Sequence, residues 1–258
     1  MNTTARRTAG FGHYFLAVPF LLLFAGTSSA EDAYFVLIFG SQQTPNNPNY
    51  SHSFATFAKA TGIGPCAGKP TLEKPAVLDF QTISWLPQNM VVRTRALWPE
   101  CGHNFGLHET ICNALKNDER VSMWGPYLVD EDLYCRALKQ IRLLESGQVR
   151  YKAVDVGYRS DEVSNCIHAV SSIVDGIKLR VASPGWGEMA SFYIKQRMRP
   201  WIVDQDETHD RVAYALGLEA YPIIYRDKTN PRSGAFFGPV SRILGGERNL
   251  LSTYGPSR

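Results

Sequence analysis

The stretch Ser164–Ser172, SNCIHAVSS, places a cysteine where a helix is expected to begin. Ser164 or Asn165 can cap this helix, because their side-chain oxygens accept hydrogen bonds from the first free backbone N–H groups. Apolar residues then recur at helical spacing, at Ile167, Val170, Ile173 and Val174. The positive end of a helix dipole favours a thiolate, so the sequence predicts a lowered pKa and a nucleophilic character for Cys166.

A cysteine nucleophile needs a base, and the useful histidine lies on a firm element that is distant in sequence. His52 fits best, because residues 51–58 alternate as a strand on which His52 shares a face with Phe54 and Thr56. His168 follows Cys166 by two positions, which turns it about 200° around a helix, so we do not expect it to be the base. His209, near the start of a late helix, is the reserve candidate.

The pattern Asn165-Cys166-x-His168, followed by apolar residues and preceded by a strand histidine, resembles the permuted papain-fold families. These include the lecithin–retinol acyltransferase-like enzymes, whose pattern reads Asn-Cys-Glu-His-Phe-Val, and the circularly permuted NlpC-type amidases. The resemblance implies an α+β fold in which an antiparallel sheet packs against helices. It also implies that Cys166 attacks an amide or ester to form a thioester, that His52 is its base, and that the Cys166 N–H helps to hold the oxyanion.

This chain departs from the acyltransferase pattern in one respect: no second histidine occurs between His52 and His103. A polar residue on a neighbouring strand could orient His52 instead, and Ser84, Gln81 and Asp79 are the open alternatives. We expect no cofactor and no metal.

The first 30 residues are expected to be a signal peptide. They combine a basic segment at Arg6 and Arg7, an apolar run over residues 14–25 and a small-residue cleavage site at 28–30. The run is shorter than the roughly 20 residues of a membrane span, so we expect a secreted or periplasmic protein with no stable span after cleavage.

Residues 31–258 suffice for a single domain. From about residue 230 the Pro and Gly content rises, and no element is assigned there. Removing the two arginines from the formal charge of +3 leaves +1, which offers no electrostatic footprint for nucleic acid or an acidic membrane.

Five cysteines leave one thiol unpaired if the other four form disulfides, as exported cysteines usually do. Cys166 has the best reason to be free, and the pairing among Cys66, Cys101, Cys112 and Cys135 stays open. A rival interpretation is a zinc site, because Cys101, His103, His108 and Cys112 offer four ligand side chains within a short stretch.

The remaining pattern predicts strands first and helices later, which is typical of an α+β domain. Strands are expected over residues 33–40, 51–58, 77–86, 90–97, 149–156, 178–182 and 222–226, and helices over 107–117, 130–146, 188–199 and 207–216 as well as after Cys166.

Three candidate functions follow from these observations. The first is an exported cysteine-dependent hydrolase or acyltransferase acting on a peptide, cell-wall or lipid-type acyl substrate through Cys166 and His52. The alternative is a non-catalytic secreted binding or structural domain stabilised by disulfides. A zinc hydrolase that uses His103, His108 and Cys112 comes third.

Overall fold

A computed structural model describes residues 31–63, 65–66, 69–70, 77–182 and 185–227. The expected signal peptide and the segment from about residue 230 lie outside these residues. The chain forms strands and helices in this order: β1 (Glu31–Gln42), η1 (Pro48–Tyr50), β2 (Ser51–Ile63), β3 (Pro65–Cys66), β4 (Lys69–Pro70), β5 (Val77–Ile83), β6 (Trp85–Pro87), β7 (Glu100–Asn104), α1 (Leu107–Lys116), β8 (Arg120–Val129), α2 (Glu131–Glu145), β9 (Arg150–Tyr151), β10 (Val163–Ser164), α3 (Cys166–Asp175), α4 (Glu188–Met198), η3 (Arg199–Trp201), α5 (Asp210–Ala215), η4 (Leu218–Ala220) and β11 (Ile223–Tyr225).

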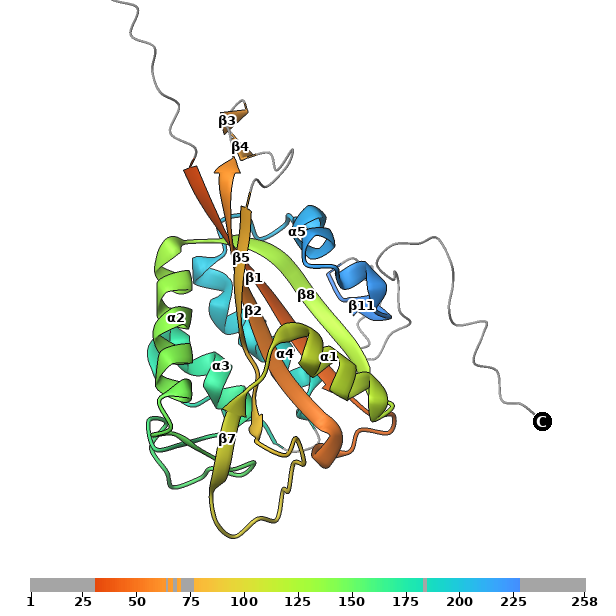
Figure 1. Ribbon diagram of the computed structural model, residues 1–258, viewed down its shortest axis with the longest axis vertical. Helices are drawn as coiled ribbons and strands as arrows, with labels where there is room; N and C mark the ends of the chain where they lie inside the picture. Colours follow the sequence, from red (N-terminus) through yellow and green to blue (C-terminus); the bar gives the residue numbers. More distant parts are fainter. Residues whose placement is uncertain (1–30, 64, 67–68, 71–76, 183–184, 228–258) are drawn as a thin grey trace, which may run out of the picture.

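The main sheet has five strands in the order β11-β8-β1-β2-β5 (Figure 1). The pairs β1–β2, β1–β8 and β2–β5 are antiparallel, and β11 pairs with β8 in parallel. A second sheet, β10-β9-β7-β6, extends one end of the molecule. The fold is therefore mixed α and β, with a largely antiparallel main sheet, as the sequence predicts.

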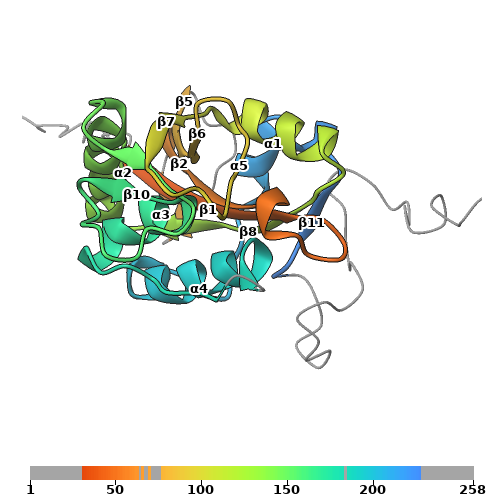
Figure 2. The ribbon, with the colours of Figure 1, turned by 90° about the horizontal axis from the view of Figure 1, so that it is seen from below.

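Both faces of the main sheet are buried, because β1 and β2 carry apolar side chains on both sides of the strand. One face packs against α2, α3 and α4 through Val36, Ile38, Ala55 and Phe57. The other packs against α1 and α5 through Phe35, Phe39 and Phe54. Figure 2 shows α1 and α4 on opposite sides of the sheet. We call these the α3–α4 face and the α1–α5 face.

Several expected elements differ from the structure. Residues 90–97 form turns and irregular backbone rather than a strand, and residues 178–182 are not a strand either. The strand expected over 149–156 is limited to β9. Five strands were not expected: the short strands β3, β4, β7 and β10, and the long strand β8, which lies inside the main sheet. In contrast, β1, β2 and the helices α1 to α4 occur where the sequence predicts them.

Candidate functional site

The start of α3 is built as the sequence predicts. Asn165 is the N-cap residue, and its Oδ1 accepts a hydrogen bond from the His168 N–H at 2.8 Å. The Asn165 amide group donates to the carbonyl oxygen of Ala153 at 3.1 Å and to Oδ1 of Asp155 at 3.2 Å. These bonds fix the cap, so Cys166 is held as the first residue of the helix.

The environment of Cys166 overturns its expected acidity. The side chain is only 8% exposed, and burial raises the pKa of its thiol to about 11. The backbone N–H groups of Ser53, Ile167 and Cys166 itself act in the opposite direction, but they do not outweigh burial. Cys166 is therefore a protonated thiol at neutral pH, because the loss of hydration opposes the thiolate more strongly than the helix start favours it.

His52 lies in β2, and its side chain is on the α1–α5 face of the sheet. Its ring stacks on Phe54 with the centroids 5.3 Å apart, and its Nε2 is 2.9 Å from the hydroxyl of Ser84. Burial lowers the pKa of His52 to about 3, so the ring is neutral at physiological pH. Of the three residues considered as its orienting neighbour, Ser84 is the one that contacts it, and Thr110 of α1 extends this chain of hydroxyls at 2.7 Å.

The structure does not bring Cys166 and His52 together. His52 pairs across the sheet with Ser41, whereas the next residue, Ser53, pairs with Gly40 on the α3–α4 face. Ser53 accordingly contacts α4, where its hydroxyl lies 2.9 Å from that of Ser191. Cys166 packs on this second face, so the sheet separates its sulfur from the His52 ring.

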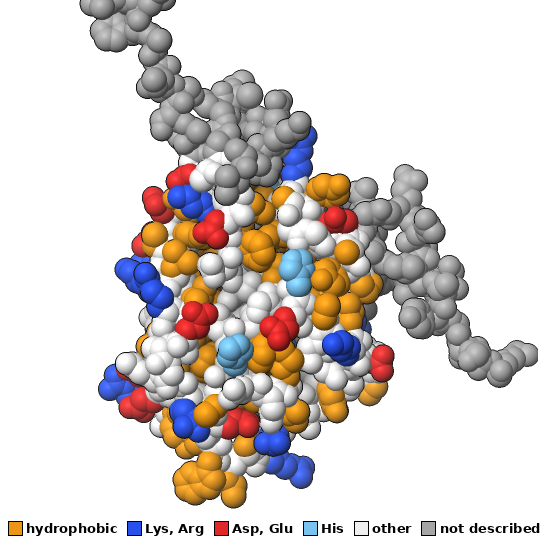
Figure 3. All heavy atoms as spheres, viewed as in Figure 1, with side chains coloured by type: hydrophobic (Ala, Val, Ile, Leu, Met, Phe, Trp, Pro, Cys, Tyr) orange, Lys and Arg blue, Asp and Glu red, His pale blue; other side chains and the backbone are white. Residues whose placement is uncertain are grey.

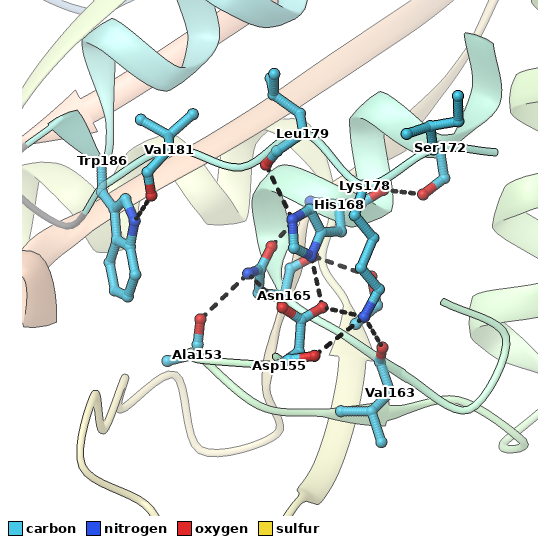
Figure 4. Close-up of polar contacts among 12 residues, drawn as sticks. Ala153, Asp155, Val163, Asn165, His168, Ser172, Lys178, Leu179, Val181 and Trp186 are labelled. Carbon is cyan, nitrogen blue, oxygen red and sulfur yellow. Dashed lines mark hydrogen bonds and ion pairs between the residues drawn. The ribbon is translucent and has the colours of Figure 1, made fainter. Parts of the chain in front are cut away.

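His168 belongs to a buried polar network beside α3 (Figure 4). Its Nδ1 is 2.5 Å from Asp155 Oδ2, and its Nε2 is 2.9 Å from the carbonyl oxygen of Leu179. Lys178 Nζ donates to the same Asp155 oxygen at 2.8 Å. Burial acts to raise the pKa of Asp155, but the hydrogen bonds and charges of His168 and Lys178 hold it below its ordinary value. The network ties the start of α3 to the loops on either side of it.

The reserve base, His209, packs against a different face of the sheet from Cys166. Its ring contacts Phe35 edge-on, with the centroids 5.2 Å apart. Phe35 belongs to the α1–α5 face, so His209 and Cys166 also lie on opposite sides of the sheet.

The candidate zinc ligands do not converge. His108 and Cys112 both contact the hydroxyl of Tyr221, at 3.1 and 3.9 Å, whereas His103 lies on β7 and packs against Phe105. Within the described ranges, no three His, Cys, Asp or Glu side chains come together to hold a metal ion.

The expected disulfides are not formed by the cysteines whose side chains are described. Cys101, Cys112, Cys135 and Cys166 are all free thiols. The side chain of Cys66 lies outside the described residues.

A cavity of about 660 Å³ lies beside His52, on the α1–α5 face. Its walls include Ser41 and His52 of the sheet, Asn113 of α1 and its C-cap residue Asn117, Glu119, and the loop of residues 89–95. We call this cavity the His52 pocket. The loop is fastened across it, because the N–H and hydroxyl of Thr94 both contact Oδ1 of Asn49, at 3.3 and 3.1 Å.

Glu119 is the carboxyl group among the residues that line the pocket. It is 7% exposed, and burial raises its pKa to about 7, although the hydroxyl of Ser41 donates to it at 2.6 Å and acts to lower the pKa. Buried titratable groups with shifted pKa values in a cavity are typical of functional sites. Sequence reasoning missed Glu119, because it lies in the charged run Lys116–Arg120 (KNDER), which is typical of a solvated turn.

A scan against protein-family models, a search of curated proteins and a search of solved structures each found no match. The resemblance to the permuted papain-fold families therefore rests on the quoted residues alone. Among the helices in the described part of the chain, none is both long and apolar enough to cross a bilayer.

Proposed function

We propose that this chain is an exported, non-catalytic binding domain whose ligand occupies the His52 pocket. The observation that carries the proposal is a cavity of about 660 Å³ with two buried titratable groups, His52 and Glu119, at its walls. Its volume lies within the range of about 300–1,000 Å³ that small-molecule sites occupy. Cys166 lies on the opposite face of the sheet and has no part in this function.

The side chains of the pocket suit a ligand rich in hydroxyl and amide groups. Asn113 of α1 and Asn117, the C-cap residue of that helix, both line the cavity, and their side-chain amides can donate as well as accept hydrogen bonds. Arg93 and Arg95 line it from the loop and can bind an acidic group of the ligand. Tyr50 is 40% exposed and offers an aromatic face beside these polar groups. We infer that the ligand is of the cell-wall type: an acidic or N-acetylated sugar, or a short peptide attached to one.

The pocket is preformed rather than assembled on binding. Thr94 and Asn49 hold the loop against η1, and the chain of hydroxyls from Thr110 through Ser84 holds the ring of His52. A ligand therefore binds without first ordering these groups, which reduces the entropic cost of association.

Binding can be measured by isothermal titration calorimetry with four probes: an N-acetylglucosamine oligomer, an oligogalacturonate, a muramyl dipeptide and an unglycosylated dipeptide. We expect at least one probe to bind, and we expect the paired substitutions Asn113→Ala and Asn117→Ala to weaken it at least about tenfold, because they remove two amides. The matched control is Gln148→Ala, which removes an amide from an exposed turn and should bind as the unaltered protein does. Absence of binding to all four probes, or equal affinity in the paired variant, would overturn the proposal.

The cysteine-dependent hydrolase or acyltransferase is the second candidate. The observation in its favour is that Cys166 is a free thiol at the first turn of α3, with backbone N–H groups directed at its sulfur. This candidate requires a base other than His52 and a movement that exposes the sulfur. Rapid labelling of Cys166 by a thiol reagent in the native protein would favour it.

A further inference from the structure

Exposed apolar side chains gather in two loops at one end of the molecule. The loop of residues 88–99, between β6 and β7, carries Leu97 and Trp98, which are 80% and 78% exposed. The loop after β9 carries Val154 and Val156, which are 42% and 73% exposed. Figure 3 shows hydrophobic side chains protruding at the lower end, where Figure 1 places the loop between β6 and β7. We call Leu97, Trp98, Val154 and Val156 the apolar tip.

The two loops are braced against each other. Lys152 Nζ donates to the carbonyl oxygen of Leu97 at 2.9 Å. Arg150 donates to the carbonyl oxygens of Pro99 and Glu100, at 3.3 and 3.1 Å. These bonds hold the backbone beneath Leu97 in place, so its exposed side chain is presented on a fixed support.

Cationic side chains lie in and beside the loop that carries Leu97 and Trp98. Arg93 and Arg95 are exposed in the loop of residues 88–99, which contains no acidic residue. Arg150 and Lys152 lie at the base of the same loop. The nearly neutral charge of residues 31–258 therefore conceals a local group of cations at this end.

The acidic groups at this end are few and lie beside arginines. Glu100 is 3.5 Å from Arg93, and Asp161 is 2.8 Å from Arg159 in the second loop. Glu162 follows on the same loop, before β10. These acids leave Arg95, Arg150 and Lys152 to give the tip a positive character.

We propose that the apolar tip docks on a lipid bilayer that bears anionic headgroups. Tryptophan and aliphatic side chains partition into the interface of a bilayer, and neighbouring arginines are attracted to anionic headgroups. The tip is a docking surface and not a span, and it does not depend on which ligand fills the His52 pocket. A second copy of the chain fits less well, because a protruding tip buries little of the roughly 1,200 Å² of a stable interface and would bring like charges together.

The test is sedimentation with vesicles, using protein purified after expression of the full chain. One set of vesicles contains phosphatidylcholine with phosphatidylglycerol, and the other contains phosphatidylcholine alone. The paired variant Leu97→Ser with Trp98→Ser should lower the partition coefficient on the anionic vesicles at least about tenfold. Replacing Arg150 and Lys152, which do not line the His52 pocket, by glutamine should lower it about tenfold or more. The matched control is Val203→Ser with Tyr214→Ser, which removes exposed apolar side chains elsewhere, 60% and 69% exposed.

Selective binding to the anionic vesicles that both tip variants lose and the control variant keeps is the expected result. The proposal fails if the protein binds neither set of vesicles, or if the tip variants bind as well as the control. It also fails if sedimentation velocity shows a dimer that the Leu97→Ser, Trp98→Ser variant abolishes, because the tip would then be a contact between copies.

Discussion

At the scale of single residues, the chemistry of Cys166 is decided by burial rather than by its place on a helix. We expect Cys166→Ala to leave the number of thiols that react with a chromogenic disulfide reagent at pH 7.5 unchanged in the native protein. The reason is that the sulfur is buried and its pKa is raised to about 11, so little thiolate is present. Counting reactive thiols before and after addition of denaturant checks this.

Cys101→Ala is the control for that count, because Cys101 is exposed and its loss should remove a readily labelled thiol. Rapid native labelling that disappears in Cys166→Ala would contradict the prediction and favour the hydrolase or acyltransferase.

The sequence was sufficient for the local geometry of residues but not for the face on which they lie. Asn165 as cap and Cys166 as first helical residue follow from local rules, and both are confirmed. Whether His52 or Ser53 points toward α3 depends on which face of β2 that helix covers. Phe54 and Phe57 make both faces of the strand apolar, so the alternation carries no information on that choice.

At the scale of elements, the sequence predicts those with a clear period and misses those without one. The apolar run of β1 and the helical period of α2 were sufficient to place them. The strand β8 was missed because it is buried along almost its whole length and so lacks alternation, and because Gly125 and Pro126 interrupt it. The sequence predicts a strand over residues 90–97, where exposed and partly buried side chains alternate. In the structure this segment pairs with no strand, so the alternation alone is misleading.

The packing of α4 on β1 depends on a glycine. A Cβ atom on Gly40 would lie 2.8 Å from the Cα of Glu188 and 2.9 Å from Oγ of Ser191. Gly40→Ala should therefore push α4 away from the sheet and lower the free energy of unfolding by about 1–3 kcal/mol. Urea unfolding followed by circular dichroism measures this.

Gly106→Ala is the matched control for that substitution, because nothing lies within 4 Å of its Cβ position. It should cost less than about 1 kcal/mol, the effect of replacing glycine at the N-cap of α1. If the two variants are equally stable, α4 does not need the close approach at Gly40.

At the scale of the whole molecule, the main sheet separates two groups of polar and titratable side chains. The α3–α4 face carries Cys166 and the Asp155 network, and the α1–α5 face carries the His52 pocket. Composition and charge predicted a nearly neutral chain of single-domain size. They could not show this division, because it depends on which helices cover each face of the assembled sheet. The pocket itself combines residues from β1, β2, α1 and a loop, so its existence depends on the assembled fold.

The pH dependence of stability follows from the His52 pocket. In the folded state the pKa of Glu119 is about 7, raised by burial from an ordinary 4.5, so the folded protein keeps a proton that the unfolded chain has already released. This contribution is fully present below pH 4.5 and is lost as the pH rises to 7. The lowered pKa of His52, about 3, acts in the opposite direction, with stability lost as the pH falls from about 6.5 toward 3.

Comparison with Glu119→Gln isolates the carboxyl group, because a glutamine can still accept the hydroxyl of Ser41 and cannot ionise. We expect the unaltered protein to lose up to about 3 kcal/mol relative to this variant between pH 5 and pH 8. Urea unfolding of both proteins at pH 5, 6, 7 and 8 measures the difference. Parallel pH profiles would mean that Glu119 ionises at its ordinary pKa, and hence that the floor of the pocket is hydrated. A profile that diverges toward alkaline pH shows instead that burial of the Glu119 carboxyl group raises its pKa in the folded protein.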